Sequence, residues 1–353
     1  MWIIGCDFHP GFQLVAIFDK ETGEITVKRL QHREEAERFY REQVPGGSVV
    51  GLEACGHTHW FENLLYEVGI EMWMGDAAQI RAAVVRAQKT DRRDAEHILR
   101  LLLEKRFPRL WVPSAEERDL RQLLVHRHKL VRMRTQVKNQ LQAMALNQGM
   151  QKKRQLWTAK GQAAFTALPL LPYARRRRQE LLETLEGLDR RIEELNRVGQ
   201  AEAAQRPAVR HLMQQPGVGW QTALGMVLTL GPVERFRHAK QVASYLGLIP
   251  REHSSGGKQR LGHICKQGST YMRFLLVEAG QSVARHDPEM KKKYQRWTQR
   301  CGRAKAKVAV ARSLAVRLYW KLREHTETAQ LAVVRHAGGP ESSRGELVEA
   351  PGA

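Results

Sequence analysis

WIIGCDFHPGFQLVAIFD, residues 2–19, contains two apolar runs on either side of the turn residues His9, Pro10 and Gly11. Each run has the length and composition of a β-strand, and the short turn between them favours an antiparallel pair. EITVKRL, residues 24–30, follows another turn and predicts a third strand. The chain is therefore expected to begin with an antiparallel meander.

Helix-like and strand-like segments alternate after the meander. REEAERFYREQ (33–43) and THWFENLLYEVG (58–69) have the spacing of amphipathic helices. SVVGLEA (48–54) and IEMWMG (70–75) are short apolar runs typical of buried strands. Strands separated by helices predict a mixed α/β sheet layered with helices, and we expect this domain to span residues 1–112.

Long amphipathic helices are predicted in the middle of the chain. Apolar residues recur at three- and four-residue steps over residues 117–146 and again over 179–198. Two such helices indicate a helical hairpin or coiled coil across residues 113–206. The pattern is equally compatible with a dimerisation arm, a nucleic-acid-spanning arm and simple packing of the two helices on each other.

A mostly α-helical domain is expected over residues 207–325. LMQQPGVGWQTALGMVL (212–228) has the form of a helix-hairpin-helix, whose PGVG turn either holds a phosphate through backbone N–H groups or is a plain turn. Residues 234–284 predict a helix, a glycine-rich loop and a second helix. Residues 326–353 are expected to form a disordered tail, because the segment after His336 is low in apolar content.

The formal net charge of +21 and the pI near 10.2 indicate a polyanionic partner, because so large an excess of Lys and Arg repels itself. The stretch 291–323 holds twelve basic residues, no acids and the aromatic residues Trp297, Tyr319 and Trp320, which is typical of a surface that binds a nucleic-acid backbone. The sequence offers no run of 18 apolar residues for a membrane span and no signal peptide. Four scattered cysteines without a CxxC pair are typical of a reducing cytoplasm.

Four acidic residues stand where a sheet would bring them together. Asp7 closes the first strand, Glu53 closes a later one, and Asp91 and Asp94 begin a helix in KTDRRDAEHI, residues 89–98. Carboxylates gathered in this way need cations to stay ionised, and Mg²⁺ is the first candidate among the hard divalent ions. The alternative is that Asp91 caps the helix and Asp94 only complements its positive first turn.

Four blocks of the sequence, taken together and in this order, resemble a known family: GCDFHPGFQLVAIFD, GLEACGHTHW, KTDRRDAEHI and GLIPREHSSGGKQRLGHICKQGSTYMR. From about Trp2 to Tyr319 the chain resembles the insertion-sequence transposases that carry a DEDD-type domain of ribonuclease H-like or RuvC-like fold. These enzymes are also described as bridge-RNA-guided recombinases. The resemblance implies a catalytic, metal-binding set of four acids at Asp7, Glu53, Asp91 and Asp94.

The resemblance also implies a serine nucleophile in a Ser-Gly loop, which matches Ser255, with Ser254 as the rival. It implies that donor DNA, target DNA and a structured noncoding guide RNA are the partners. Dimers would assemble into tetramers, with the acids of one subunit joined to the serine of another. The protein is expected to be prokaryotic, cytoplasmic and nucleoid-associated.

Basic residues near the serine and in the C-terminal stretch are predicted to contact nucleic acid. Lys258 and Arg260 are expected to hold the scissile strand, because the adjacent glycines let the backbone approach a phosphate closely. The full predicted set is Lys258, Arg260, Arg273, Lys291, Lys292, Lys293, Arg296, Arg303, Lys305 and Lys307.

Two other functions fit parts of the sequence. A structure-specific endonuclease, akin to a Holliday-junction resolvase, would use the acids and a metal-activated water and would need no serine. A non-catalytic nucleic-acid scaffold would need only the charge.

Overall fold

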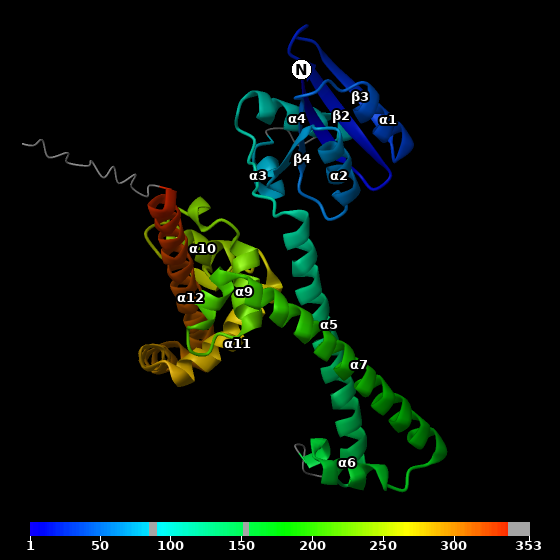
Figure 1. Ribbon diagram of the computed structural model, residues 1–353, viewed down its shortest axis with the longest axis vertical. Coiled ribbons are helices and arrows are strands. Elements are labelled where there is room, and N and C mark those ends of the chain that lie inside the picture. The colour runs from blue at the N-terminus through cyan, green and yellow to red at the C-terminus, as the bar shows by residue number, and fades with distance from the viewer. Residues whose placement is uncertain (85–89, 151–154, 338–353) are drawn as a thin grey trace, which may run out of the picture. The chain divides into compact units, whose positions relative to one another are not determined.

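The computed structural model describes residues 1–84, 90–150 and 155–337, and it divides into two compact units, residues 1–112 and 113–353 (Figure 1). Lys89 of the KTDRRDAEHI block and residues 338–353 of the predicted tail lie outside the described residues.

The first unit is a mixed five-stranded sheet with the order β3-β2-β1-β4-β5. The first three strands form the predicted antiparallel meander, whereas β4 and β5 run parallel to β1. This α/β arrangement confirms the predicted fold class of the N-terminal part and is consistent with a ribonuclease H-like domain. The bounds are β1 Trp2–Phe8, β2 Phe12–Asp19, β3 Ile25–Gln31, α1 Glu34–Glu42, β4 Val49–Glu53, α2 His59–Glu67, β5 Glu71–Gly75, α3 Ala77–Ala82 and α4 Asp91–Leu103.

The register of β1 and β4 places the ends of these two strands side by side. They pair in parallel from Ile3 with Val49 to Cys6 with Leu52. Asp7 and Glu53 each follow directly after the last of these pairs. This confirms the expectation that the first and fourth strands end next to each other.

The two faces of the sheet are covered by different helices. Ile4, Cys6 and Leu52 are buried in a core shared with α1 and α2. Because side chains alternate along a strand, Gly5 points to the opposite face, where α4 packs on β1 and β2. A Cβ atom on Gly5 would lie 2.4 Å from the Ala95 carbonyl oxygen and from the Leu99 amide nitrogen. The absence of a side chain at Gly5 thus lets α4 lie directly on β1.

The substitution Gly5→Ala is expected to destabilise the first unit by about 1–3 kcal/mol, the usual cost of overpacking a filled core. Backbone atoms of α4 surround the new methyl group, so that α4 itself must shift and carry the residues at its start with it. The measurement is the free energy of unfolding in denaturant. Gly46→Ala is the matched control, because a Cβ there meets nothing within 4 Å. Equal stability of the two variants would contradict this account of the contact.

The second unit is mainly helical, as predicted. The long helices α5 and α7 pack against each other and form, with α6, one core of this unit, while α8 to α12 form another (Figure 1). The bounds are α5 Ala115–Asn147, the short 3₁₀ helix η1 Gln155–Trp157, α6 Ala159–Thr166, α7 Pro172–Gln205, α8 Pro207–Met213, α9 Trp220–Leu230, the 3₁₀ helix η2 Val233–Arg235, α10 Ala239–Tyr245, β6 Pro250–Glu252, β7 Leu261–Ile264, α11 Thr270–His286 and α12 Pro288–Ala337.

Three local features differ from the sequence prediction. The predicted glycine-rich loop contains a two-stranded hairpin, β6–β7. The basic helix is interrupted at Gly302, whose φ of 79° lies outside the helical region. Helix α12 runs to Ala337, past the predicted start of the tail at residue 326.

The PGVG turn between α8 and α9 packs against α11. Gly217 has a φ of 84°, and a Cβ there would lie 2.7 Å from the Val283 amide nitrogen. Val218 is buried in the same core. This packing accounts for the glycine in the turn without a phosphate, so that of the two readings of PGVG the structure favours the plain turn.

Candidate functional site

Three potential metal ligands converge at the end of β1. His9 Nε2 lies 3.0 Å from Asp7 Oδ2 and 3.8 Å from Asp91 Oδ1. One ligand atom from each of the three residues lies within 4.8 Å of the others. Two of them, Asp7 and Asp91, were predicted from the sequence, and His9 was not.

Local structure places each of these residues. Asp7 is near the end of β1, and His9 is in the tight turn to β2, where its N–H donates to the Phe12 carbonyl oxygen over 2.9 Å. Asp91 is the first residue of α4. The N-cap of α4 is Thr90, whose hydroxyl accepts from the Arg93 N–H. The alternative role for Asp91 as the helix cap is therefore wrong, and its carboxylate is not used for capping.

The carboxyl group of Asp7 is in an environment that disfavours its charge. Burial raises the pKa of Asp7, and the nearby carboxylates of Asp94 and Asp91 raise it further, against the opposing effect of His9. Asp94 therefore acts on Asp7 electrostatically, although among the described residues it is not part of the three-residue group. A cation at this position would relieve the repulsion between these acids.

Glu53 has a different partner. Its Oε1 lies 3.4 Å from Nη2 of Arg81, which belongs to α3. Among the described residues, Glu53 is outside the group formed by Asp7, His9 and Asp91. The structure thus brings two of the four predicted acids into one group, a third within electrostatic reach of it, and pairs the fourth with an arginine.

These residues fit a divalent cation. Two carboxylates supply the oxygen ligands that hard cations prefer, and an imidazole nitrogen extends the set toward transition metals such as Mn²⁺. Burial and, to a smaller extent, the carboxylates of Asp94 and Asp91 raise the pKa of Asp7, and a bound cation would favour its ionised form. The first unit therefore contains a candidate divalent-metal site.

The predicted serines lie on the β6–β7 hairpin of the second unit. Gly256 and Gly257 have φ values of 57° and 73°, and positive φ at both central residues is what a type I′ hairpin turn requires. Ser255 and Lys258 flank this turn, and the Lys258 N–H donates to the Ser255 carbonyl oxygen over 3.1 Å. The turn therefore presents Ser255 at the tip of the hairpin.

The two serine hydroxyls differ in their hydrogen bonds. The Ser254 hydroxyl donates to Glu252 Oε1 over 2.6 Å and accepts from the Arg260 N–H over 3.1 Å. The Ser255 side chain is exposed, and its hydroxyl makes no hydrogen bond with a residue that the structure describes. Ser254 thus braces the hairpin across its two strands, and Ser255 is available to another molecule.

Known proteins resemble this chain over both units. A transposase family model of the IS110 DEDD type matches residues 4–150, and the model described as Transposase IS116/IS110/IS902 family matches residues 209–295. A probable family 20 transposase of Pseudomonas aeruginosa is 30% identical over 311 residues, which are 84% of this chain and 90% of the relative. The chain belongs to the IS110/IS116 family of DEDD transposases.

Other relatives are also described as transposases. The transposase for insertion sequence element IS1111A of Coxiella burnetii is 28% identical over 80% of this chain and 79% of its own length. The transposase for insertion sequence element IS1328 of Yersinia enterocolitica is 26% identical over 66% and 70%. The protein is thus a transposase, an enzyme that cleaves DNA and transfers strands, and the alternative of a non-catalytic scaffold is excluded.

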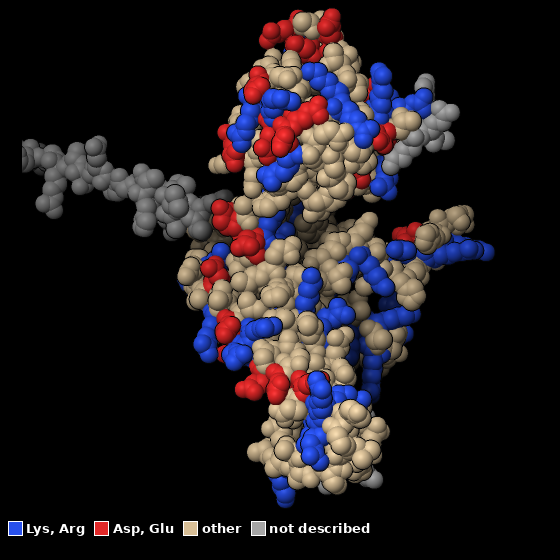
Figure 2. All heavy atoms as spheres, turned by 90° about the vertical axis from the view of Figure 1, so that its right-hand side faces the viewer, with Lys and Arg blue, Asp and Glu red and all other residues tan. Residues whose placement is uncertain are grey.

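Many of the predicted nucleic-acid-binding residues of the transposase are exposed. Figure 2 shows Lys and Arg side chains spread over the displayed face of the helical unit. Lys293, near the start of α12, is not exposed. It is half-buried, and its Nζ lies 2.5 Å from Glu289 Oε1. The exposed members of the predicted set are Lys258, Arg260, Lys291, Lys292, Arg296, Arg303 and Lys305, while Lys307 is half-buried.

Part of the C-terminal basic stretch has structural roles that the sequence did not reveal. Arg317 pairs with Asp287 and Glu289, which precede the stretch. Tyr319 is fully buried, and its hydroxyl donates to the Phe236 carbonyl oxygen over 2.9 Å. The prediction that Tyr319 belongs to a nucleic-acid-binding surface is therefore wrong, whereas Trp320 is 46% exposed.

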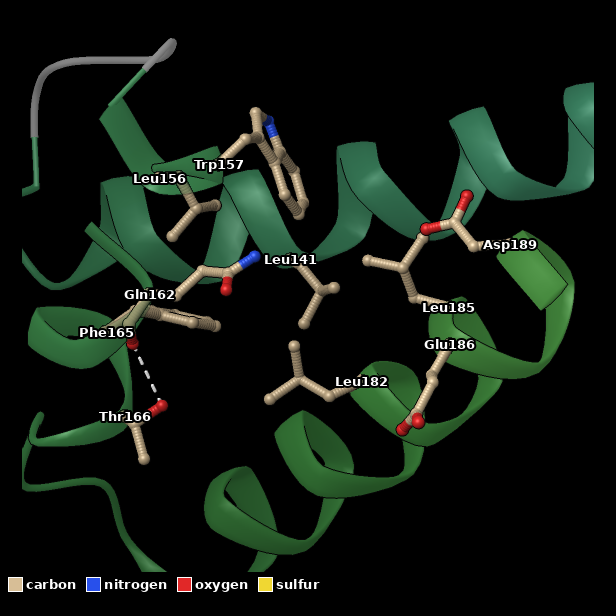
Figure 3. A pocket seen from close by; sticks show the side chains of 10 residues that line it. All are labelled: Leu141, Leu156, Trp157, Gln162, Phe165, Thr166, Leu182, Leu185, Glu186 and Asp189. Carbon is tan, nitrogen blue, oxygen red and sulfur yellow. Dashed lines mark hydrogen bonds between the residues drawn. The ribbon is translucent and has the colours of Figure 1, made fainter. Parts of the chain in front are cut away.

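A cavity of about 370 Å³ lies near the end of the α5–α7 hairpin (Figure 3). Its wall combines apolar and polar side chains and contains none of the predicted site residues. Beside it, the buried Arg178 donates to the Phe165 carbonyl oxygen over 2.6 Å, so that at least this arginine of the run 175–178 holds α6 to α7. The lining residues are Leu141, Leu156, Trp157, Gln162, Phe165, Thr166, Leu182, Leu185, Glu186 and Asp189.

Within the described residues, none of the helices of the transposase is both long enough and apolar enough to cross a lipid bilayer.

Proposed function

We propose that this transposase is an RNA-guided DNA recombinase that uses a Mg²⁺-binding acidic site and a serine nucleophile. The observation that carries the proposal is the convergence of Asp7 and Asp91 at the end of β1, with Asp94 close enough to raise the pKa of Asp7. The exposed Ser255 at the tip of a tight hairpin supplies the second component.

In the first unit, Asp7, Asp91 and Asp94 would hold Mg²⁺, with His9 orienting Asp7 through their 3.0 Å contact. A bound ion supplies charge neutralisation at the scissile phosphate. Glu53 would complete the set once Arg81, which is largely exposed, turns away from it. Arg81 would then be free to contact the DNA backbone.

In the second unit, the Ser255 hydroxyl would attack the scissile phosphorus. The serine hydroxyl loses its proton and forms a new ester bond to phosphorus, while the bond from phosphorus to the leaving deoxyribose oxygen breaks. The leaving oxygen takes up a proton and becomes a hydroxyl, so that the phosphodiester passes from one alcohol to the other. Lys258 and Arg260 flank the serine on the same hairpin and would hold the phosphate during this step. The free hydroxyl of Ser255 supports its assignment as the nucleophile.

Ser254 is the second candidate, and one observation favours it. Its hydroxyl donates to the Glu252 carboxylate over 2.6 Å, which is the contact that a base-activated serine makes. The Arg260 N–H opposes this role, because a hydroxyl oxygen that accepts a backbone hydrogen bond is held in place and is less nucleophilic. We therefore assign the bracing role to Ser254.

A structured guide RNA is proposed as the partner that selects donor and target DNA. The net charge of +21 suits a protein that reads the backbones of several nucleic-acid strands, as other guided systems do. Homodimers that assemble into tetramers would join the acids of one subunit to the serine of another. The proposed domains are a metal-binding domain (1–112), a helical linker region (113–206), a C-terminal transposase domain (207–325) and a tail (326–353). The protein is proposed to be cytoplasmic and nucleoid-associated.

Sequencing the nucleic acid that copurifies with the transposase tests whether the protein binds a defined guide RNA. We expect one defined noncoding RNA with two internal loops. Removing it with ribonuclease should abolish recombination, and adding back an RNA with one changed loop should redirect recombination to the matching DNA. Copurification of random cellular RNA, with recombination that survives ribonuclease treatment, would contradict guidance by RNA.

A Holliday-junction resolvase-like endonuclease is the alternative activity, because the acidic group is contained in the first unit by itself. Water would then be the nucleophile. Trapping a covalent protein–DNA adduct separates the two mechanisms, since only the serine mechanism produces one.

A further inference from the structure

The hairpin that carries Ser255 projects from its unit. Every residue from Arg251 to His263 is exposed, whereas the helices on either side of the segment contribute to the buried core. Few contacts can therefore fix the position of the tip. The direction of the hairpin must be set at its base, where the polypeptide leaves the core at Gly247 and returns to it at Gly268.

The segments that enter and leave the hairpin lie in close contact at this base. Gly247 and Gly268 have φ values of 66° and 69°. A Cβ on Gly247 would lie 2.2 Å from the Gln267 carbonyl oxygen, and one on Gly268 would lie 2.1 Å from the Tyr245 carbonyl oxygen. The two backbone segments are thus in direct contact in the region of the hairpin base.

Arg273 occupies that region. Its Nη1 donates to the Leu246 carbonyl oxygen over 3.4 Å, to the Gly268 carbonyl oxygen over 3.2 Å and to the Gln267 carbonyl oxygen. Its Nη2 donates to the Thr270 hydroxyl over 3.0 Å. The Arg273 guanidinium therefore links the backbone segment before the hairpin to the backbone segment after it.

Arg273 is itself held by a fixed element. It lies in the first turn of α11, which begins with a Ser269 cap that accepts from the Met272 N–H over 3.1 Å. Met272 and Leu276 of the same helix are fully buried. The planar fork of an arginine can bridge several acceptors at once, which a lysine ammonium on a flexible stem does poorly.

We propose that Arg273 is a positioning residue that fixes the direction of the Ser255 hairpin. This inference rests on the proposed serine mechanism, and it replaces a phosphate contact as the main role of Arg273. Misplacing a reacting atom by about 1 Å can cost about a hundredfold in rate, so the loss of this tie would slow the chemical step and leave DNA affinity nearly unchanged.

The test compares Arg273→Lys with Arg273→Ala in the full chain with its copurified RNA. Both variants are expected to speed hydrogen exchange of the amides in residues 250–264 by about tenfold or more and to slow formation of the covalent DNA adduct by about a hundredfold. Affinity for the DNA duplex should change by less than about threefold. Arg285→Lys and Arg285→Ala are the matched controls, because Arg285 is an exposed arginine on the same helix.

Two results would overturn the proposal. If Arg273→Lys behaved like the wild type, a charge would suffice and a phosphate contact would explain the residue. If exchange of the hairpin amides were unchanged in Arg273→Ala, the guanidinium would not fix the hairpin. Failure of the serine mechanism is seen separately, as the absence of a covalent DNA adduct in the wild type while hydrogen exchange of the hairpin amides still speeds up in Arg273→Ala.

Discussion

The substitution Asp7→Asn is expected to reduce DNA cleavage by about a thousandfold or more. A metal ion at the reacting phosphate contributes several kcal/mol of transition-state stabilisation, and each 1.4 kcal/mol is a factor of ten in rate. Asp7 is the residue around which His9 and Asp91 are arranged, and an amide at this position removes one negative charge from the site. The measurement is single-turnover cleavage of a DNA substrate at saturating Mg²⁺.

The same variant is expected to be more stable than the wild type when no metal is present. The pKa of Asp7 is raised in the folded protein, so its contribution to stability is present in acid and is lost as the pH rises through that pKa. At neutral pH the ionised carboxylate therefore opposes folding, and asparagine cannot ionise. Added Mg²⁺ should reverse the order, since binding stabilises the wild type by about 2.7 kcal/mol at a hundred times its dissociation constant.

Asp19→Asn is the control for both measurements. Asp19 ends the neighbouring strand β2, is half-buried, and accepts from the Trp2 indole N–H over 2.9 Å. A backbone hydrogen bond from Glu21 and the Trp2 contact lower the pKa of Asp19, so its contribution to stability has the opposite sign and is lost toward acid pH. Normal cleavage by Asp7→Asn, or a Mg²⁺-induced stabilisation equal to that of the wild type, would show that Asp7 is not a ligand.

The first unit was predictable because its pattern is local. Apolar runs separated by short turns define the strands, and alternation with helices defines the parallel pair that places Asp7 beside the end of β4. His9 was missed because it stands in a turn, where a His-Pro pair is ordinary. Its spacing of two from Asp7, across the end of a strand, was the available signal.

Side-chain partners were not predictable to the same degree. Glu53 ends the expected strand, but its contact with Arg81 depends on a helix, α3, that the sequence pattern did not predict. Arg317 is one of the twelve basic residues of the acid-free stretch 291–323, yet Asp287 and Glu289, which stand just before that stretch, pair with it. A charge pattern along one segment gives the sign of a surface and cannot show which charges are paired.

The hairpin shows the same limit for backbone structure. SSGG predicts a flexible loop by composition, and the two glycines are needed there for a turn with positive φ at both central residues. The resemblance to a family singled out Ser255. Only the geometry separates its free hydroxyl from the braced hydroxyl of Ser254.

The substitution Ser255→Ala is expected to abolish the covalent protein–DNA adduct and to lower recombination by at least about a thousandfold, because loss of a nucleophile leaves only the binding and electrostatic parts of catalysis. DNA affinity should be unchanged, since an exposed hydroxyl contributes little to binding a polyanion. The adduct is detected by denaturing electrophoresis, and the modified peptide is mapped by mass spectrometry.

Ser254→Ala and Glu252→Gln decide between the two serines. If Ser254 only braces the hairpin, Ser254→Ala removes two hydrogen bonds across it and slows adduct formation moderately, while the adduct still maps to Ser255. Glu252→Gln keeps an acceptor for the Ser254 hydroxyl and should then be nearly as active as the wild type. If Ser254 were the nucleophile and Glu252 its base, Glu252→Gln would be as inactive as Ser254→Ala and Ser255→Ala would still form the adduct. An adduct that persists in the double variant of both serines would show that another side chain is the nucleophile. If the wild type formed no adduct at all, water at the acidic site would be the remaining nucleophile.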